Sequence, residues 1–148
     1  MVGGLGAVIN GVGRIAWGVI SDKIGFKNSF RALTILQMLA MLSYPFSVHS
    51  KLTFALNTCV LFFCLAGNFA LMPPATQKMF GPKNGAVLYG ILFSAFAIAS
   101  VVGGTLTKML SIQYGWNRVF HLLAGLSLLA NLLLTQVRPI PNLTYSSV

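Results

Sequence analysis

Charged residues are scarce in this sequence, and acidic ones are almost missing. Only 7% of the 148 residues are charged, and Asp22 is the single acidic residue. Hydrophobic residues make up 56%, and the mean hydropathy is +0.81. A water-soluble domain carries about 25% charged residues, and a domain of this length still leaves roughly a third of its unfolded surface in water. The composition therefore excludes a soluble globular domain and predicts a protein that is embedded in lipid.

The shortage of acidic residues and cysteines also limits the chemistry of the chain. One carboxylate cannot form a carboxylate pair, and no nucleophile lies beside a base. Cys59 and Cys64 share one apolar run without His or acidic neighbours, which excludes a disulfide framework and makes a poor metal site. We expect no enzyme activity, no metal and no cofactor, and we interpret both cysteines as packing residues.

Basic residues are present, but they are dispersed along the chain. Lys and Arg number 10, and the net charge is +9. Nucleic-acid binders cluster such residues on one face, so we expect no nucleic-acid partner. Basic residues beside membrane spans instead mark the cytoplasmic side. One side holds Lys23, Lys27, Arg31, Lys78, Lys83 and Arg138, and the other holds Lys51, Lys108 and Arg118. The side with more basic residues is predicted to be cytoplasmic, which places residues 21–30 and the tail from Arg138 inside and Met1 outside. The glycosylation pattern at Asn142 then faces the cytoplasm and is not used.

Apolar runs of about 20 residues, the length of a membrane span, follow one another along the chain. None shows the alternation of a β-barrel strand. We therefore predict an all-α polytopic membrane helix bundle, with residues 1–148 as a single transmembrane domain. Its five predicted spans have the approximate limits 2–20, 31–48, 52–72, 86–109 and 117–137. Pro73 and Pro74, together with Gly67 and Asn68, predict an interruption near the cytoplasmic end of the third span.

Arg14 lies inside the first predicted span. A charged side chain there costs about 2.5 to 3.5 kcal/mol on insertion scales and marks a functional site by default. Helical spacing places Asn10 and Gly18 on the same face. Two interpretations stay open: Arg14 snorkels to the headgroups, or it is a buried arginine that binds an anion. Asn10, one turn deeper in the span, favours the anion site.

A motif of glycines and charges follows the first span. Its members are Gly18, Asp22, Lys23, Gly25 and Lys27. The motif resembles the signature of the major facilitator superfamily, in which a Gly, three residues, an Asp, a basic residue, one residue and a Gly precede further basic residues; Phe26 departs from it. The resemblance implies a cytoplasmic loop whose charges meet helix ends in one transporter conformation and separate in the other. We therefore expect these five residues to form a conformational gate motif.

Three further stretches identify the subfamily that the chain resembles. Residues 10–18 resemble the eighth helix of oxalate/formate antiporters and related monocarboxylate transporters, and residues 80–90 and 114–120 resemble the entries to their eleventh and twelfth helices. The resemblance implies helices eight to twelve of a twelve-helix carrier. The chain is then an incomplete C-terminal half, and the missing N-terminal half of the carrier is its expected partner.

The same resemblance implies a substrate site. The family's arginine in the eighth helix pairs with a substrate carboxylate, and Arg14 occupies that position. Oxalate carriers place a lysine in the eleventh helix where this chain has Phe96, so one buried cation favours a monocarboxylate over a dianion; a zwitterion or an uncharged substrate stays open. Asn10 on the face of Arg14, and Tyr89, Phe93 and Phe96 as the apolar lining, complete the candidate site, with helix packing as the alternative role for the aromatic residues.

We expect transport of a small organic anion by alternating access, in a multi-pass protein of the plasma membrane. Symport, antiport and proton coupling stay open. His121, near the outer end of the last span, is the candidate proton carrier. A histidine without a carboxylate partner more often takes no part in proton transfer. The alternative is a truncated membrane subunit or regulator without transport of its own. Three explanations of the short chain stay open. It is a fragment of a carrier, a natural truncated protein that associates with another polypeptide, or a self-assembling membrane protein.

Overall fold

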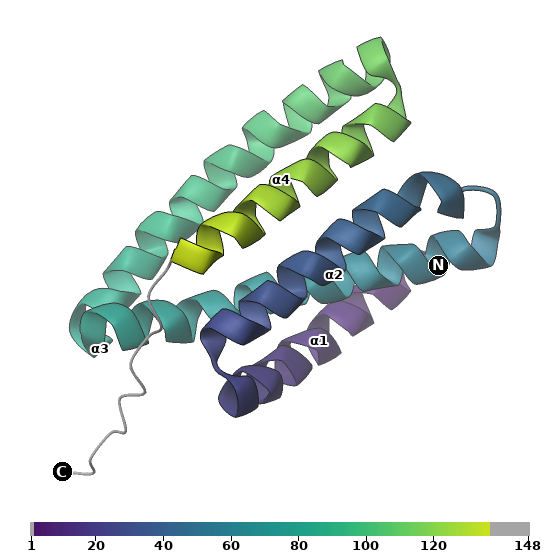
Figure 1. The fold of residues 1–148 in the computed structure, drawn as a ribbon. Coiled ribbons are helices and arrows are strands. Elements are labelled where there is room, and N and C mark those ends of the chain that lie inside the picture. Colours follow the sequence, from purple (N-terminus) through teal and green to yellow (C-terminus); the bar gives the residue numbers. More distant parts are fainter. Residues whose placement is uncertain (1, 137–148) are drawn as a thin grey trace.

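The computed structural model describes residues 2–136, except the side chains of residues 2, 82 and 83. Its helices are α1 (Val2–Ile24), α2 (Phe26–Ser47), α3 (Lys51–Tyr114) and α4 (Trp116–Gln136). Figure 1 shows them packed side by side as long rods joined by short turns. The predictions made for Met1, Arg138, Asn142 and the side chain of Lys83 lie outside the described residues.

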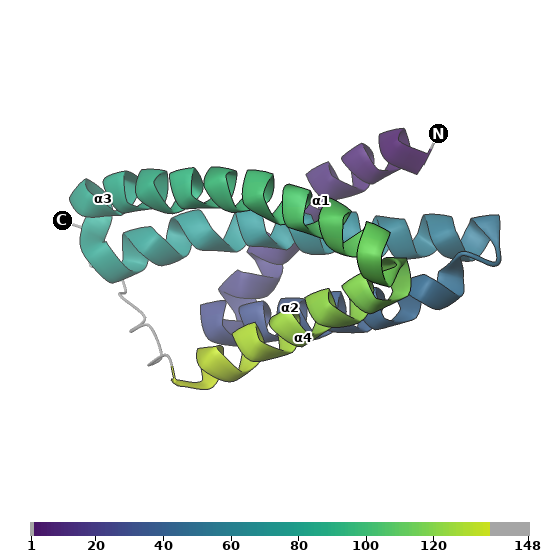
Figure 2. The same cartoon turned by 90° about the horizontal axis from the view of Figure 1, so that it is seen from above.

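Helix α3 consists of two segments that fold back on each other (Figures 1 and 2). The chain turns at Gly81, whose φ of 79° and ψ of 162° are not helical. We call Lys51–Gly81 the first segment of α3 and Asn84–Tyr114 the second segment. The interruption predicted at Pro73 and Pro74 is wrong, because the helix continues through both prolines. Proline only removes a backbone donor and is tolerated in membrane helices, whereas glycine at positive φ can reverse the chain.

The all-α membrane bundle predicted from the composition is confirmed. The described residues contain five helical segments, and four of them are long and apolar enough to cross a membrane: α1, both segments of α3, and α4. Helix α2 is less apolar, with Lys27 and Arg31 near its start. The segment between the first two predicted spans, residues 21–30, is almost entirely helical, because α1 continues to Ile24 and α2 begins at Phe26.

The tightest core lies where α1, α2 and the first segment of α3 meet. Trp17, Leu33 and Leu71 are nearly fully buried there, one from each helix. Gly67 permits this approach, because a Cβ at this position would collide with Leu33 and lie 2.9 Å from the Trp17 ring. Trp17 Nε1 also donates a hydrogen bond to the carbonyl of Phe63 at 3.0 Å. Burial and this bond together lock α1 onto the first segment of α3.

Helices α2 and α4 pair through polar contacts. Asn131 Nδ2 donates to Thr34 Oγ1 at 2.8 Å and to the carbonyl of Arg31 at 3.3 Å. Lys27 Nζ donates to the carbonyl of Thr135 at 3.2 Å, in the last turn of α4, where a cation is favourable. These bonds place the end of α4 beside the joint between α1 and α2, in agreement with the antiparallel arrangement in Figure 1.

Candidate functional site

Arg14 is held from two sides on an exposed face of α1. Its Nε donates to Asn10 Oδ1 at 3.3 Å, and its guanidinium carbon lies 5.1 Å from the centre of the Phe69 ring. The first contact follows from helical spacing, because Asn10 stands one turn earlier on the same face. The second is a cation–π contact with the first segment of α3. Within residues 2–136, no acceptor bonds the two terminal amino groups of Arg14.

Asn10 connects Arg14 to the first segment of α3. Its Nδ2 donates to the carbonyl of Phe62 at 3.4 Å, while its Oδ1 accepts the bond from Arg14. The half-buried amide therefore uses its donor and its acceptor in opposite directions. This arrangement fixes the direction in which the guanidinium of Arg14 points. The anion-binding interpretation expected a buried arginine, whereas the guanidinium in this structure is exposed beside these contacts.

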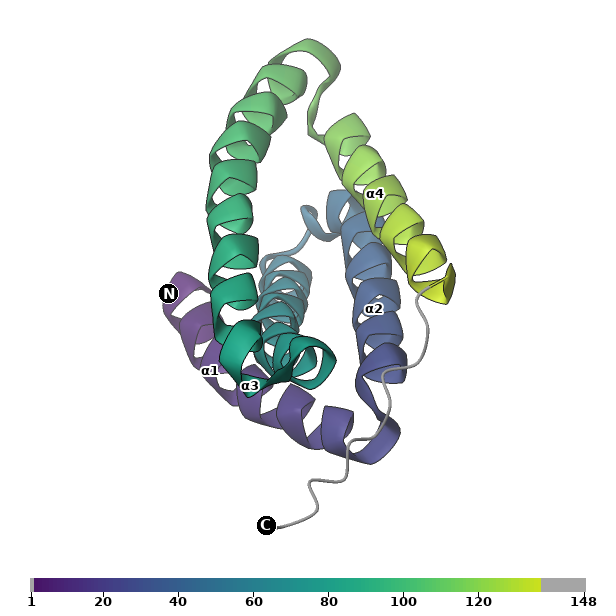
Figure 3. The ribbon, with the colours of Figure 1, turned by 90° about the vertical axis from the view of Figure 1, so that its left-hand side faces the viewer.

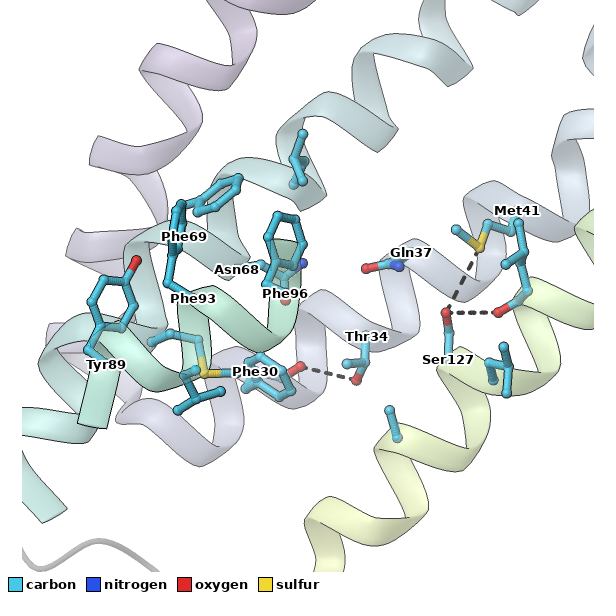
Figure 4. A pocket seen from close by; sticks show the side chains of 16 residues that line it. Phe30, Thr34, Gln37, Met41, Asn68, Phe69, Tyr89, Phe93, Phe96 and Ser127 are labelled. Atoms are coloured by element: carbon cyan, nitrogen blue, oxygen red, sulfur yellow. Dashed lines mark hydrogen bonds between the residues drawn. The ribbon is translucent and has the colours of Figure 1, made fainter. Parts of the chain in front are cut away.

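Four aromatic side chains form a connected group, which we call the aromatic cluster (Figure 4): Phe69, Tyr89, Phe93 and Phe96. The ring of Phe69 lies 5.5 Å from Phe96 in an edge-on arrangement and 6.1 Å from Phe93. Tyr89 extends the group through Phe93, at 6.0 Å. The cluster joins both segments of α3 to Arg14. The structure thus brings the four candidate residues Arg14, Asn10, Tyr89 and Phe96 into one chain of contacts.

Phe69 was missed by the sequence analysis, although it stands at the centre of these contacts. It touches Arg14 on one side and two rings of the second segment of α3 on the other. The only local signal was its neighbour Asn68, a polar residue inside an apolar run. Phenylalanine in such a run is indistinguishable from a lipid-facing residue until the helices are packed.

A cavity of about 430 Å³ opens between α2, α4 and the two segments of α3 (Figure 4). The aromatic cluster forms one wall, and Arg14 is not among its described lining residues. The polar groups at its surface are Thr34, Gln37, Asn68 and Ser127. Asn68 Nδ2 donates to the carbonyl of Cys64 in its own helix. The cavity is therefore mostly apolar, and Phe69 lies between it and the arginine.

The gate motif is spread over the joint between α1 and α2. Gly25 has a φ of 81°, a conformation that glycine adopts readily, and it turns the chain between α1 and α2. Lys23 stands in the last turn of α1, and Lys27 bonds α4. Asp22 is exposed and makes no ion pair among the described residues, and Gly18 has open space around it. A gate role for these residues stays a prediction.

The two cysteines and His121 belong to the packing and to the surface. Cys59 and Cys64 are buried and free, which confirms them as packing residues. His121 is exposed, and its Nδ1 donates to the carbonyl of Asn117 at 2.5 Å in the same helix. No carboxylate partner for His121 occurs among the described residues, since Asp22 is the chain's one acidic side chain.

Comparison with known proteins gives consistent matches. The family model of the Major Facilitator Superfamily matches residues 1–146. The chain is 31% identical to apicoplast pyruvate carrier 1 of Toxoplasma gondii, over 99% of this chain and 27% of the carrier. It is also 31% identical to the oxalate:formate antiporter of Oxalobacter formigenes, over 89% of this chain and 32% of the antiporter. The chain therefore spans about a third, or less, of the length of these relatives.

Proposed function

The chain belongs to the major facilitator superfamily, and from that premise we propose that it forms part of a carrier that moves a small monocarboxylate across a membrane. The observation that carries this proposal is the state of Arg14. Its Nε donates to Asn10 and its guanidinium lies over the ring of Phe69, while its terminal amino groups have no described partner. Those two groups are the donors that a carboxylate accepts side by side.

The surroundings of Arg14 favour a single negative charge. Within residues 2–136, the described side chains in contact with Arg14 or the aromatic cluster include no second cation, so a dianion would stay half neutralised. The rings of the aromatic cluster lie beside the guanidinium and can contact the short apolar part of a monocarboxylate. Two relatives, a pyruvate carrier and an oxalate:formate antiporter, are named for small carboxylates, which supports a small carboxylate as substrate.

The proposal concerns a protein larger than these residues. The helices described here correspond to helices eight to twelve of a twelve-helix carrier, in one transmembrane domain, and the rest of the carrier supplies the second wall of the substrate path. Alternating access then rocks the two halves about Arg14, with the gate motif at the cytoplasmic ends of the helices. The multi-pass protein resides, in this proposal, in the plasma membrane.

Uptake of labelled pyruvate, lactate, formate and oxalate by a carrier that contains this sequence tests the proposal. Replacing Arg14 by Ala is expected to abolish uptake of the monocarboxylates. Arg118→Ala is the matched control, because Arg118 is an exposed arginine at the start of α4, away from the aromatic cluster. Equal uptake by the Arg14→Ala variant and the unchanged carrier, at equal amounts in the membrane, would overturn the anion-site role.

The competing function is that of a membrane subunit or regulator without transport of its own. In that case the chain associates with a resident carrier, and the association survives Arg14→Ala. Co-purification of the chain and its Arg14→Ala variant from membranes separates this function from the first.

A further inference from the structure

The paired helices α2 and α4 have two sides, and the cavity lies on only one of them. Figure 3 shows the two helices side by side, and the bond from Asn131 to Thr34 marks where they touch. Each residue of a helix is turned by about 100° from the one before it. Ile35 and Leu132 each follow a contact residue by one position, and because the helices are antiparallel, both turn to the same side. The cavity lies on the opposite side, where Gln37 lines it.

We call the side without the cavity the outer face of the α2–α4 pair. We define it by four residues: Arg31, Ile35, Leu128 and Leu132. Three of them are apolar and exposed, by 41% at Ile35, 48% at Leu128 and 55% at Leu132. From Arg31 to Leu42, the next exposed apolar positions along α2, the helix rises about 16 Å. This is about half of the 30 Å hydrocarbon core, so the face matches the acyl chains of one leaflet in length.

Cations gather at one end of this face. Lys27 and Arg31 stand one turn apart on α2, and Lys23 lies in the last turn of α1. Like charges one turn apart repel each other. Asp22, the chain's one acidic side chain, makes no ion pair among the described residues, and the guanidinium of Arg31 has no hydrogen-bond acceptor within residues 2–136. A negative charge that neutralises this end must therefore come from another molecule.

We propose that the outer face of the α2–α4 pair binds one anionic phospholipid. Its phosphate accepts hydrogen bonds from the guanidinium of Arg31, whose paired donors fit phosphate oxygens. Lys23 and Lys27 add to the attraction, and the acyl chains lie along Ile35 and Leu132. The charge count predicts that this end of the bundle is cytoplasmic, where the leaflet carries anionic lipids and attracts clustered Lys and Arg.

The lipid also joins the two helices that it touches. Lys27 Nζ already bonds the carbonyl of Thr135 at the end of α4, and the phosphate lies beside this contact. The lipid site shares no residue with the carboxylate site at Arg14, which is on α1. Binding of the lipid and transport of a carboxylate can therefore be tested separately, and a failure of one proposal leaves the other intact.

Lipid binding to the full chain in neutral detergent, measured by native mass spectrometry, tests the proposal without any transport measurement. The probes are phosphatidylglycerol and phosphatidylcholine with the same acyl chains. We expect phosphatidylglycerol to bind about fivefold or more tightly, because each cation near an anionic headgroup contributes about a fivefold factor. Arg31→Gln should remove most of this preference, whereas Arg31→Lys keeps the charge and should retain it. Lys108→Gln is the matched control, because Lys108 is an exposed cation near the end of α3, away from the outer face.

A second pair of variants tests the apolar part of the site. Leu132 and Leu133 are equally exposed, at 55%, but they stand about 100° apart on α4. Leu132→Ser should weaken phosphatidylglycerol binding about threefold, because apolar contact with the acyl chains is lost. Leu133→Ser should leave it unchanged, and an excess of inorganic phosphate should not displace the lipid.

Four results would overturn the proposal. The first is equal binding of the two lipids, and the second is an equal loss of preference in Lys108→Gln and Arg31→Gln. The third is equal weakening by Leu133→Ser and Leu132→Ser, which would show that the acyl chains have no defined place on α4. The fourth is displacement of the lipid by inorganic phosphate, which would show a site for phosphate alone.

Discussion

At the scale of single residues, the proposed binding of a carboxylate depends on the direction of one guanidinium, that of Arg14. Arg14 and Asn10 were identified from the sequence because their contact is local, one helical turn apart. Phe69 was not, since it reaches Arg14 from another helix. Periodicity shows which residues share a face of one helix, but it does not show which face of the next helix will meet them.

Asn10→Ala is expected to weaken substrate binding more than it slows transport. The substitution removes the acceptor that holds Arg14 Nε, and hydrogen bonds to charged groups contribute about 1.5 to 3 kcal/mol. The KM for a monocarboxylate should rise about tenfold or more, with a smaller change in the maximal rate. Concentration-dependent uptake measures both quantities.

Asn57→Ala is the matched control for this substitution. Asn57 also donates to a neighbouring helix, through Ser43 Oγ at 3.1 Å, but it contacts neither Arg14 nor the aromatic cluster. Its loss should leave the KM unchanged. A fall in maximal rate with constant KM in Asn10→Ala would instead show that Asn10 only supports the fold.

At the scale of the helices, glycines determine where the chain turns and where helices touch. The turn at Gly81 falls within the gap between the predicted spans 52–72 and 86–109, but the prolines at 73 and 74, where the interruption was expected, are helical. A glycine's role depends on what faces it, and sequence alone does not supply that neighbour. Gly67 and Gly90 show the difference: the first lies against Leu33 and Trp17, and the second faces open space.

Gly67→Ala is therefore expected to destabilise the bundle, while Gly90→Ala is not. The added methyl group at Gly67 collides with the core of α1, α2 and α3, and overpacking of this kind costs about 1 to 3 kcal/mol. At Gly90 the methyl group meets nothing, and alanine favours the helix by up to about 1 kcal/mol. Thermal unfolding in detergent, followed by the fluorescence of the buried Trp17, compares the two; equal midpoints would contradict the assigned core.

At the scale of the whole molecule, the composition and motifs were sufficient to identify a partial major facilitator bundle. Lipid contains no water to bond the backbone, so every apolar span of this length must form a helix that satisfies its own backbone hydrogen bonds. They did not show that the first segment of α3 packs against α1 and α2 through Trp17, Leu33 and Leu71, because the apolar pattern of one helix does not identify its neighbours. Small residues such as Gly103 mark a face for close packing without identifying its neighbour.

In the proposed carboxylate site, the number of cations is expected to set the class of substrate, and Phe96→Lys tests this directly. Phe96 lies 5.5 Å, ring to ring, from Phe69, which in turn contacts Arg14, so a lysine there adds a second cation near the first. The ratio of oxalate uptake to pyruvate uptake should rise about tenfold, since a second paired charge favours the dianion by roughly 1.4 kcal/mol or more. Phe96→Met removes the ring without adding charge and should leave the ratio unchanged. If both variants shift the ratio equally, the ring at position 96 and not the number of cations selects the substrate.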